Sequence, residues 1–212
     1  MEHKGPKMPW ATKEEALAAA DAGDAKACAM IGEQYYRGNG GFPVDYDKAY
    51  QYAAKAAEQG EARAYNMLGL MYQNGAGVGK DMEQAVACFE KAVELGDFKA
   101  PRQLGLLYEA GEGVAQDYAK AAANYAKAAE HGDITGQYCL GQLYEKGLGV
   151  EQDYAKAMEL YLVSGARGDD IAAPAIGAIA HLYREGLGVA QDDAKADEWQ
   201  AKYEAAKKLH LH

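Results

Sequence analysis

A stretch of about three dozen residues recurs along this chain, and this repetition restricts the possible folds more than any other feature of the sequence. A tyrosine closes the first half of every copy, so the spacing can be read directly from the five positions. These are Tyr35, Tyr72, Tyr108, Tyr144 and Tyr183. We place the copies at about 27–60, 64–96, 100–132, 136–168 and 175–207. Regular repetition at this period is typical of proteins in which small units stack in a row.

Each copy predicts two helices joined by a turn. Four glycines stand three residues before the repeated tyrosine: Gly32, Gly69, Gly105 and Gly141. Glycine within a helix costs about 1 kcal/mol relative to alanine, so we expect a neighbouring helix to approach closely there. A Gly-x-Gly-Val turn follows in four copies, and glycine supplies the positive φ that often ends a helix. An aspartate then suits the N-cap of the second helix: Asp45, Asp81, Asp117, Asp153 and Asp192.

A single helix–turn–helix unit cannot bury its own apolar face, and stacking the units buries it. Because packed helices lie about 8–10 Å apart, we expect a curved rod of about five repeats. Thr12-Lys-Glu-Glu15 is a capping box that begins a short N-terminal capping helix ending near Ala22. The last helix continues past Lys207, where the closing glycine is missing, and acts as the C-terminal cap. We expect a flexible arm over 1–11 and a single domain over 12–212.

The motif Ala-x-x-x-Leu-Gly-x-x-Tyr-x-x-Gly-x-Gly-Val, followed by Asp-x-x-x-Ala and Ala-Ala-Glu-x-Gly, resembles the Sel-one-like repeat (SLR) family, a relative of the tetratricopeptide repeats. The resemblance covers about Ala27 to Tyr203. It implies an all-α, right-handed α-solenoid superhelix that serves as an adaptor or scaffold for other proteins, often in bacterial signalling, secretion or host contact. Some exported members join the helices of a repeat by a disulfide, but here the cysteines fall in different repeats.

Charge and cysteine content limit the class of partner. The formal net charge is −10, which disfavours nucleic acid and anionic membranes and mildly favours a basic partner. The three cysteines are odd in number and widely spaced, which argues against a disulfide framework. No signal peptide and no run long enough to span a membrane is visible. We therefore expect a protein of the bacterial cytoplasm, monomeric by default.

No motif carries recognisable chemistry. Gly75-Ala-Gly-Val-Gly79-Lys80 lacks the spacing of a phosphate loop, and Asp81 stands where serine or threonine is needed. Ser164 is the single serine, and Arg167 replaces the lysine that Ser-x-x-Lys chemistry requires. The histidines show no ligand spacing with the cysteines. We expect no enzyme activity, no cofactor and no metal site.

The face of each first helix opposite the Leu/Gly/Tyr stripe remains for a partner. In tetratricopeptide-like solenoids the corresponding face lines the concave groove. At 100° per residue it contains polar residues and a few apolar anchors. The predicted partner-binding residues are Tyr36, Arg37, Asn66, Leu70, Gln73, Asn74, Arg102, Leu106, Glu109, Tyr138, Gln142, Lys146, His181 and Arg184. Of these, Asn66, Gln73, Asn74 and Arg102 form a patch able to bond a peptide backbone or a carboxylate.

The sequence therefore favours a non-enzymatic interaction scaffold that holds a protein or peptide in the groove. Two alternatives stay open at this point. One is a hydrolase of β-lactams or cell-wall material, which the single serine disfavours. The other is a small acidic inhibitor or immunity protein that masks a basic effector, for which binding should weaken strongly with salt.

Overall fold

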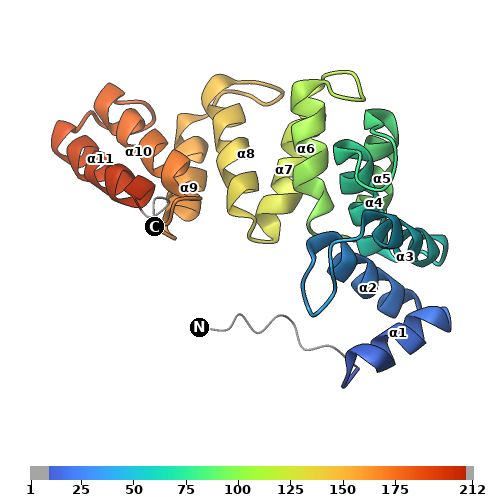
Figure 1. The fold of residues 1–212 in the computed structure, drawn as a ribbon. Helices are drawn as coiled ribbons and strands as arrows, with labels where there is room; N and C mark the ends of the chain where they lie inside the picture. Colours follow the sequence, from blue (N-terminus) through green and yellow to red (C-terminus); the bar gives the residue numbers. More distant parts are fainter. Residues whose placement is uncertain (1–9, 209–212) are drawn as a thin grey trace. The chain divides into compact units, whose positions relative to one another are not determined.

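The computed structural model describes residues 10–208, and in this range all regular secondary structure is helical (Figure 1). The helices are α1 (Lys13–Asp21), α2 (Ala25–Arg37), α3 (Tyr46–Glu58), α4 (Ala62–Asn74), α5 (Met82–Glu94), α6 (Ala100–Ala110), α7 (Tyr118–Glu130), α8 (Ile134–Lys146), α9 (Tyr154–Gly165), α10 (Ala173–Glu185) and α11 (Asp193–Lys208). The all-α prediction is confirmed. The even-numbered helices from α2 to α10 are the first helices of the five repeats, and the helix after each is its second helix.

The chain divides into two compact units, Met1–Ala100 and Pro101–His212, and each is described by itself. In the first unit α1 packs on α2, the pairs α2/α3 and α4/α5 form hairpins, and α3 packs on α4. In the second unit the pairs α8/α9 and α10/α11 form hairpins, α7 packs on α8, and α9 packs on α10. Contacts within a hairpin alternate with contacts between hairpins, which is the stacking that the repeats predict. The expectation of one domain over 12–212 stays a prediction.

The capping residues stand where the sequence predicts them. Every repeated aspartate is the N-cap of a second helix and accepts a hydrogen bond from the main-chain N–H three residues later. Gly75 ends α4 with φ of 67°, in the left-handed region that glycine adopts without strain. At the N-terminus Thr12 accepts from the Glu15 N–H at 3.1 Å, whereas the Glu15 carboxylate accepts from Ala11 at 2.9 Å rather than from Thr12.

In the second, third and fourth repeats the glycine inside the first helix makes room for an aromatic ring of the second helix. A Cβ on Gly141 would lie 2.6 Å from the ring of Tyr161, and one on Gly105 would lie 2.6 Å from the ring of Tyr125. The prediction of a close helix approach is therefore refined, because in these copies a buried ring occupies the space. Only Gly32 of these four faces main chain of the paired helix, with Ala49 O at 3.2 Å from the position of its Cβ.

A lysine covers the repeated tyrosine in four repeats. The ammonium of Lys120 lies 5.0 Å from the centre of the Tyr108 ring, and Lys156 lies 5.1 Å from that of Tyr144. The same contact recurs in the first and fifth repeats. These tyrosines are buried or half-buried, so the ring packs in the hairpin while the cation shields its outer side.

The two ends and the irregular fifth repeat follow from local sequence. Trp10 is half-buried against the N-terminal core, and the rest of the predicted arm up to residue 9 lies outside the described residues. Pro174 stands in the first turn of α10, where its missing N–H costs nothing. The C-terminal helix α11 continues through Lys207, as predicted. Within residues 10–208 no helix is both long and apolar enough to cross a bilayer.

Candidate functional site

The candidate site is the first-helix face, defined as the fourteen partner-binding residues predicted above. In the first unit this face comprises Tyr36, Arg37, Asn66, Leu70, Gln73 and Asn74. Two contacts join α2 and α4 on this side. The Asn74 side-chain amide donates to the Tyr36 hydroxyl at 3.2 Å, and Arg63 forms an ion pair with Glu33. The two first helices of this unit therefore lie side by side and present one continuous surface.

The polar residues of this first surface differ in exposure. Arg37 and Asn74 are exposed, and Leu70 and Gln73 are half-buried. Asn66 was expected on the surface but is only 6% exposed, and its Oδ1 has no hydrogen-bond partner. A buried amide oxygen without a donor is costly, so an external donor that reached Asn66 would be favoured.

In the second unit the face comprises Arg102, Leu106, Glu109, Tyr138, Gln142, Lys146, His181 and Arg184. Three of these already have partners within the unit. Arg102 Nε lies 3.1 Å from Asp133, Arg184 lies 2.7 Å from Asp197, and Glu109 accepts a 2.6 Å hydrogen bond from the Tyr125 hydroxyl. Lys146 and His181 are exposed, Gln142 is half-buried, and Leu106 is 38% exposed. Leu106 is thus a partly exposed apolar side chain on a mostly polar face.

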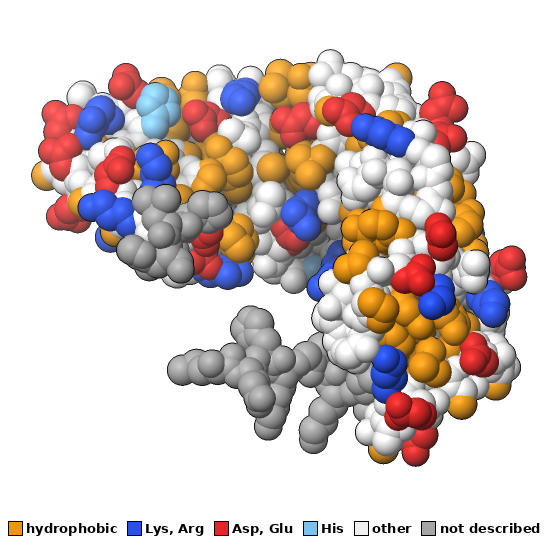
Figure 2. All heavy atoms as spheres, in the orientation of Figure 1, with side chains coloured by type: hydrophobic (Ala, Val, Ile, Leu, Met, Phe, Trp, Pro, Cys, Tyr) orange, Lys and Arg blue, Asp and Glu red, His pale blue; other side chains and the backbone are white. Residues whose placement is uncertain are grey.

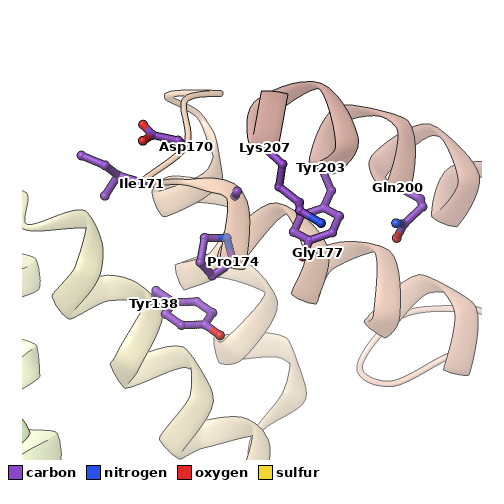
Figure 3. Close-up of a pocket in the computed structure, with 9 residues that line it drawn as sticks. Tyr138, Asp170, Ile171, Pro174, Gly177, Gln200, Tyr203 and Lys207 are labelled. Carbon is purple, nitrogen blue, oxygen red and sulfur yellow. The ribbon is translucent and has the colours of Figure 1, made fainter. Parts of the chain in front are cut away.

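A pocket of about 750 Å³ opens on this unit where α8, α10 and α11 meet (Figure 3). Its walls include the rings of Tyr138 and Tyr203 and the side chains of Ile171 and Pro174, and Lys207 stands at its edge. Ile171 belongs to the segment in which the fifth repeat is longer than the others. The Tyr203 ring lies directly over Gly177, since a Cβ there would be 3.3 Å from the ring. A pocket of this size, with aromatic walls and a few polar groups, has room for a small ligand or for several side chains of a partner.

Figure 2 shows one side of the molecule, on which acidic, basic and hydrophobic side chains are intermingled. No single sign of charge dominates that view, although the whole chain carries a formal net charge of −10. Recognition there would depend on a few defined residues rather than on a uniform field.

The side chains with potential chemistry have structural roles. Ser164 is 1% exposed, and its hydroxyl donates to the Ile134 carbonyl at 2.8 Å. Burial raises the pKa of Cys139 to about 11, and the three cysteines are free thiols. Burial and a hydrogen bond to Glu145 raise the pKa of the Tyr161 hydroxyl. Among residues 10–208 no group of histidine, cysteine and carboxylate side chains is arranged to hold a metal ion.

One set of residues was missed by the sequence reasoning. The carboxylate that follows the repeated tyrosine accepts a hydrogen bond from the tyrosine sixteen residues later, at 2.6 Å in both Glu109–Tyr125 and Glu145–Tyr161. The sequence holds part of this signal, because the second repeat has Gln73 and Phe89 at the two positions. The first repeat breaks the pattern, since it has Tyr36 and Tyr52 there and the Tyr52 hydroxyl donates to Asp21.

Comparison with solved structures finds close likeness over most of the chain. A protective antigen of uropathogenic Escherichia coli with an SLR fold is 35% identical, with a TM-score of 0.83 over 93% of this chain. The present chain covers 42% of that protein's length. A Sel1 repeat protein from Oxalobacter formigenes is 31% identical, with a TM-score of 0.81. The match covers 92% of the present chain and 79% of the Oxalobacter protein.

More distant structures share the fold alone. An immunity protein of Pseudomonas aeruginosa is 23% identical, with a TM-score of 0.54. The match covers 92% of the present chain and 73% of the immunity protein. No curated protein matches the sequence closely enough to count as a relative.

The Sel1 repeat model matches five consecutive segments, residues 25–61, 62–97, 100–133, 134–169 and 173–199. Together these segments cover most of the chain and coincide with the five hairpins from α2 to α11. By sequence and by structure, this chain belongs to the Sel1 repeat family.

Proposed function

We propose that the protein is a non-enzymatic adaptor that binds a segment of a partner protein on its first-helix face. The observation that carries this proposal is a partly exposed apolar anchor, Leu106, on a polar face whose unit also has a tyrosine-walled pocket. Binding surfaces combine a few apolar or aromatic anchors with a polar rim in this way. Repeat scaffolds of this kind use extended faces to hold other chains.

The absence of enzyme activity is part of the same proposal. The only serine is buried and its hydroxyl is engaged, which supports a structural role and disfavours a serine hydrolase. Likeness to an immunity protein at 23% identity concerns the fold alone, so the inhibitor hypothesis gains no separate support. The location in the cytoplasm stays a prediction.

Site-specific photocrosslinking tests the proposal with a matched pair of positions. Leu106 on the first helix α6 is 38% exposed, and Leu162 on the second helix α9 is 39% exposed. A photoreactive residue placed at 106 should crosslink a partner in the native cell, and the same residue at 162 should not. Crosslinking at 162 and not at 106 would show that the opposite surface binds.

A further inference from the structure

Three cations gather on the first unit of a chain whose formal net charge is −10. Arg37 and Arg63 both pair with Glu33, Arg37 at 3.0 Å, so one carboxylate serves two guanidiniums. The side chains of Arg37 and Arg63 are still 56% and 43% exposed. Some N–H donors of both guanidinium groups therefore face outward and can bind a further carboxylate.

Lys99 extends this cluster at the start of α6. Burial, and after it the charges of Arg63 and Arg37, lower the pKa of Lys99, while Asp97 acts in the opposite sense. The Asp97 carboxylate also caps α6, accepting from the N–H groups of Lys99 and Ala100 at 2.9 and 2.7 Å. Lys99 is nonetheless exposed, with its ammonium 5.6 Å from the centre of the Phe98 ring, so a carboxylate of a partner can reach it.

Asn66 provides a second and independent observation in the same unit. It follows Arg63 by three residues on α4 and therefore lies about one helical turn away on the same side. Its side chain is more than nine-tenths buried, and its Oδ1 has no hydrogen-bond partner. A main-chain N–H of a bound peptide is a donor that would satisfy this oxygen.

We propose that Arg37, Arg63 and Lys99, together with Asn66, bind an extended acidic segment of a partner protein. This inference rests on the proposed adaptor function and specifies the chemistry of the partner. Carboxylates of the segment pair with the outward donors of the two arginines and with Lys99. One main-chain N–H bonds to Asn66 when this side chain, which is buried in the free protein, turns toward the segment. A protein segment is favoured over nucleic acid because the chain as a whole is strongly acidic and would repel a polyphosphate outside this cluster.

The test is an unbiased selection of short random peptides on the full-length protein, followed by affinity measurement on the selected peptides. The selected sequences should be enriched in aspartate and glutamate. Arg63→Glu with Lys99→Glu should weaken binding of a selected peptide by roughly tenfold or more, equivalent to about 1.4 kcal/mol. Lys80→Glu with Lys127→Glu changes the net charge by the same amount at exposed positions elsewhere and should alter the affinity less than twofold.

Asn66→Ala distinguishes the hydrogen bond between Asn66 and the bound peptide from general electrostatic attraction. It should weaken peptide binding several-fold without lowering the melting temperature, because it removes a buried acceptor that has no partner. Selection of neutral or basic peptides would overturn the inference. So would equal losses in the two charge-reversed pairs, no effect of Asn66→Ala on affinity, or tighter binding of a single-stranded oligonucleotide than of any selected peptide.

Failure of the acidic-segment inference can be distinguished from failure of the adaptor proposal. A native partner that crosslinks at position 106 and binds equally well to Arg63→Glu with Lys99→Glu would refute the acidic-segment inference and leave the adaptor role intact. Failure of any partner to crosslink at position 106 would count against the adaptor role itself.

Discussion

Replacing the glycine inside a first helix tests the packing that makes each hairpin. Gly141 lies in α8, and alanine has the better helix propensity by about 1 kcal/mol. Propensity alone therefore predicts that Gly141→Ala stabilises the protein. Its Cβ, however, would lie 2.6 Å from the Tyr161 ring, well inside normal contact. Overpacking of this kind costs about 1–3 kcal/mol.

The Tyr161 ring cannot easily withdraw, because its hydroxyl is held by Glu145 at 2.6 Å. We therefore place the overpacking cost near its upper end, which leaves a net destabilisation of about 1–2 kcal/mol after the gain in propensity. For a chain of this size the melting temperature should fall by about 2–4 °C per kcal/mol. Thermal and urea unfolding followed by circular dichroism measure this change.

The fifth repeat supplies the control. It has Ala180 where the other repeats have glycine, and Gln200 where the paired helix of the fourth repeat has Tyr161. In a Tyr161→Gln background, Gly141→Ala should therefore be neutral or stabilising by up to about 1 kcal/mol. A rise in melting temperature caused by Gly141→Ala in the otherwise unchanged protein would refute the reasoning, as would the same shift in both backgrounds.

Three further predictions concern buried or half-buried side chains. Ser164→Ala should lower the free energy of unfolding by about 0.5–1.5 kcal/mol, measured in urea, because it removes a buried hydrogen bond to the Ile134 carbonyl, which as the first residue of α8 keeps its bond within the helix. The folded pKa values of Tyr52 and Tyr72 are raised from 10.0 to about 12, for Tyr52 chiefly by burial and for Tyr72 chiefly by its hydrogen bond to Tyr50. Their contribution to stability should be complete below pH 10 and lost as the pH rises from 10 to 12, so unfolding and the tyrosinate absorbance should rise together. Cys139, whose pKa is about 11, should react slowly with iodoacetamide at pH 8 and quickly once urea unfolds the chain; fast reaction without urea would contradict its burial.

The helices and their ends could be predicted because they depend on local chemistry. Asp117 caps α7 through its own side chain, and Gly75 ends α4 by its φ, so neighbouring residues suffice to place both. Pairings across a hairpin could not be placed in this way. Tyr161 follows Gly141 by twenty residues and Glu145 by sixteen, so the ring that requires Gly141 and the hydroxyl that Glu145 holds reach these partners only through packing.

The candidate face was predicted only in outline. A helical wheel gives the direction of each side chain from its own helix, but it does not include the neighbouring helices that cover the edges of the face. Asn66 is buried, although the wheel places it beside the half-buried Leu70. Arg102 lies on the predicted face but is paired with Asp133, a residue that belongs to the next repeat.

The affinity of a captured partner for two leucine variants tests the central claim most directly. Leu106→Glu and Leu162→Glu introduce the same charge at almost equal exposure, on a first and a second helix respectively. If the first-helix face binds the partner, Leu106→Glu should raise the dissociation constant at least about tenfold, and Leu162→Glu should leave it within about twofold. An unchanged dissociation constant for Leu106→Glu together with a large rise for Leu162→Glu would contradict the claim.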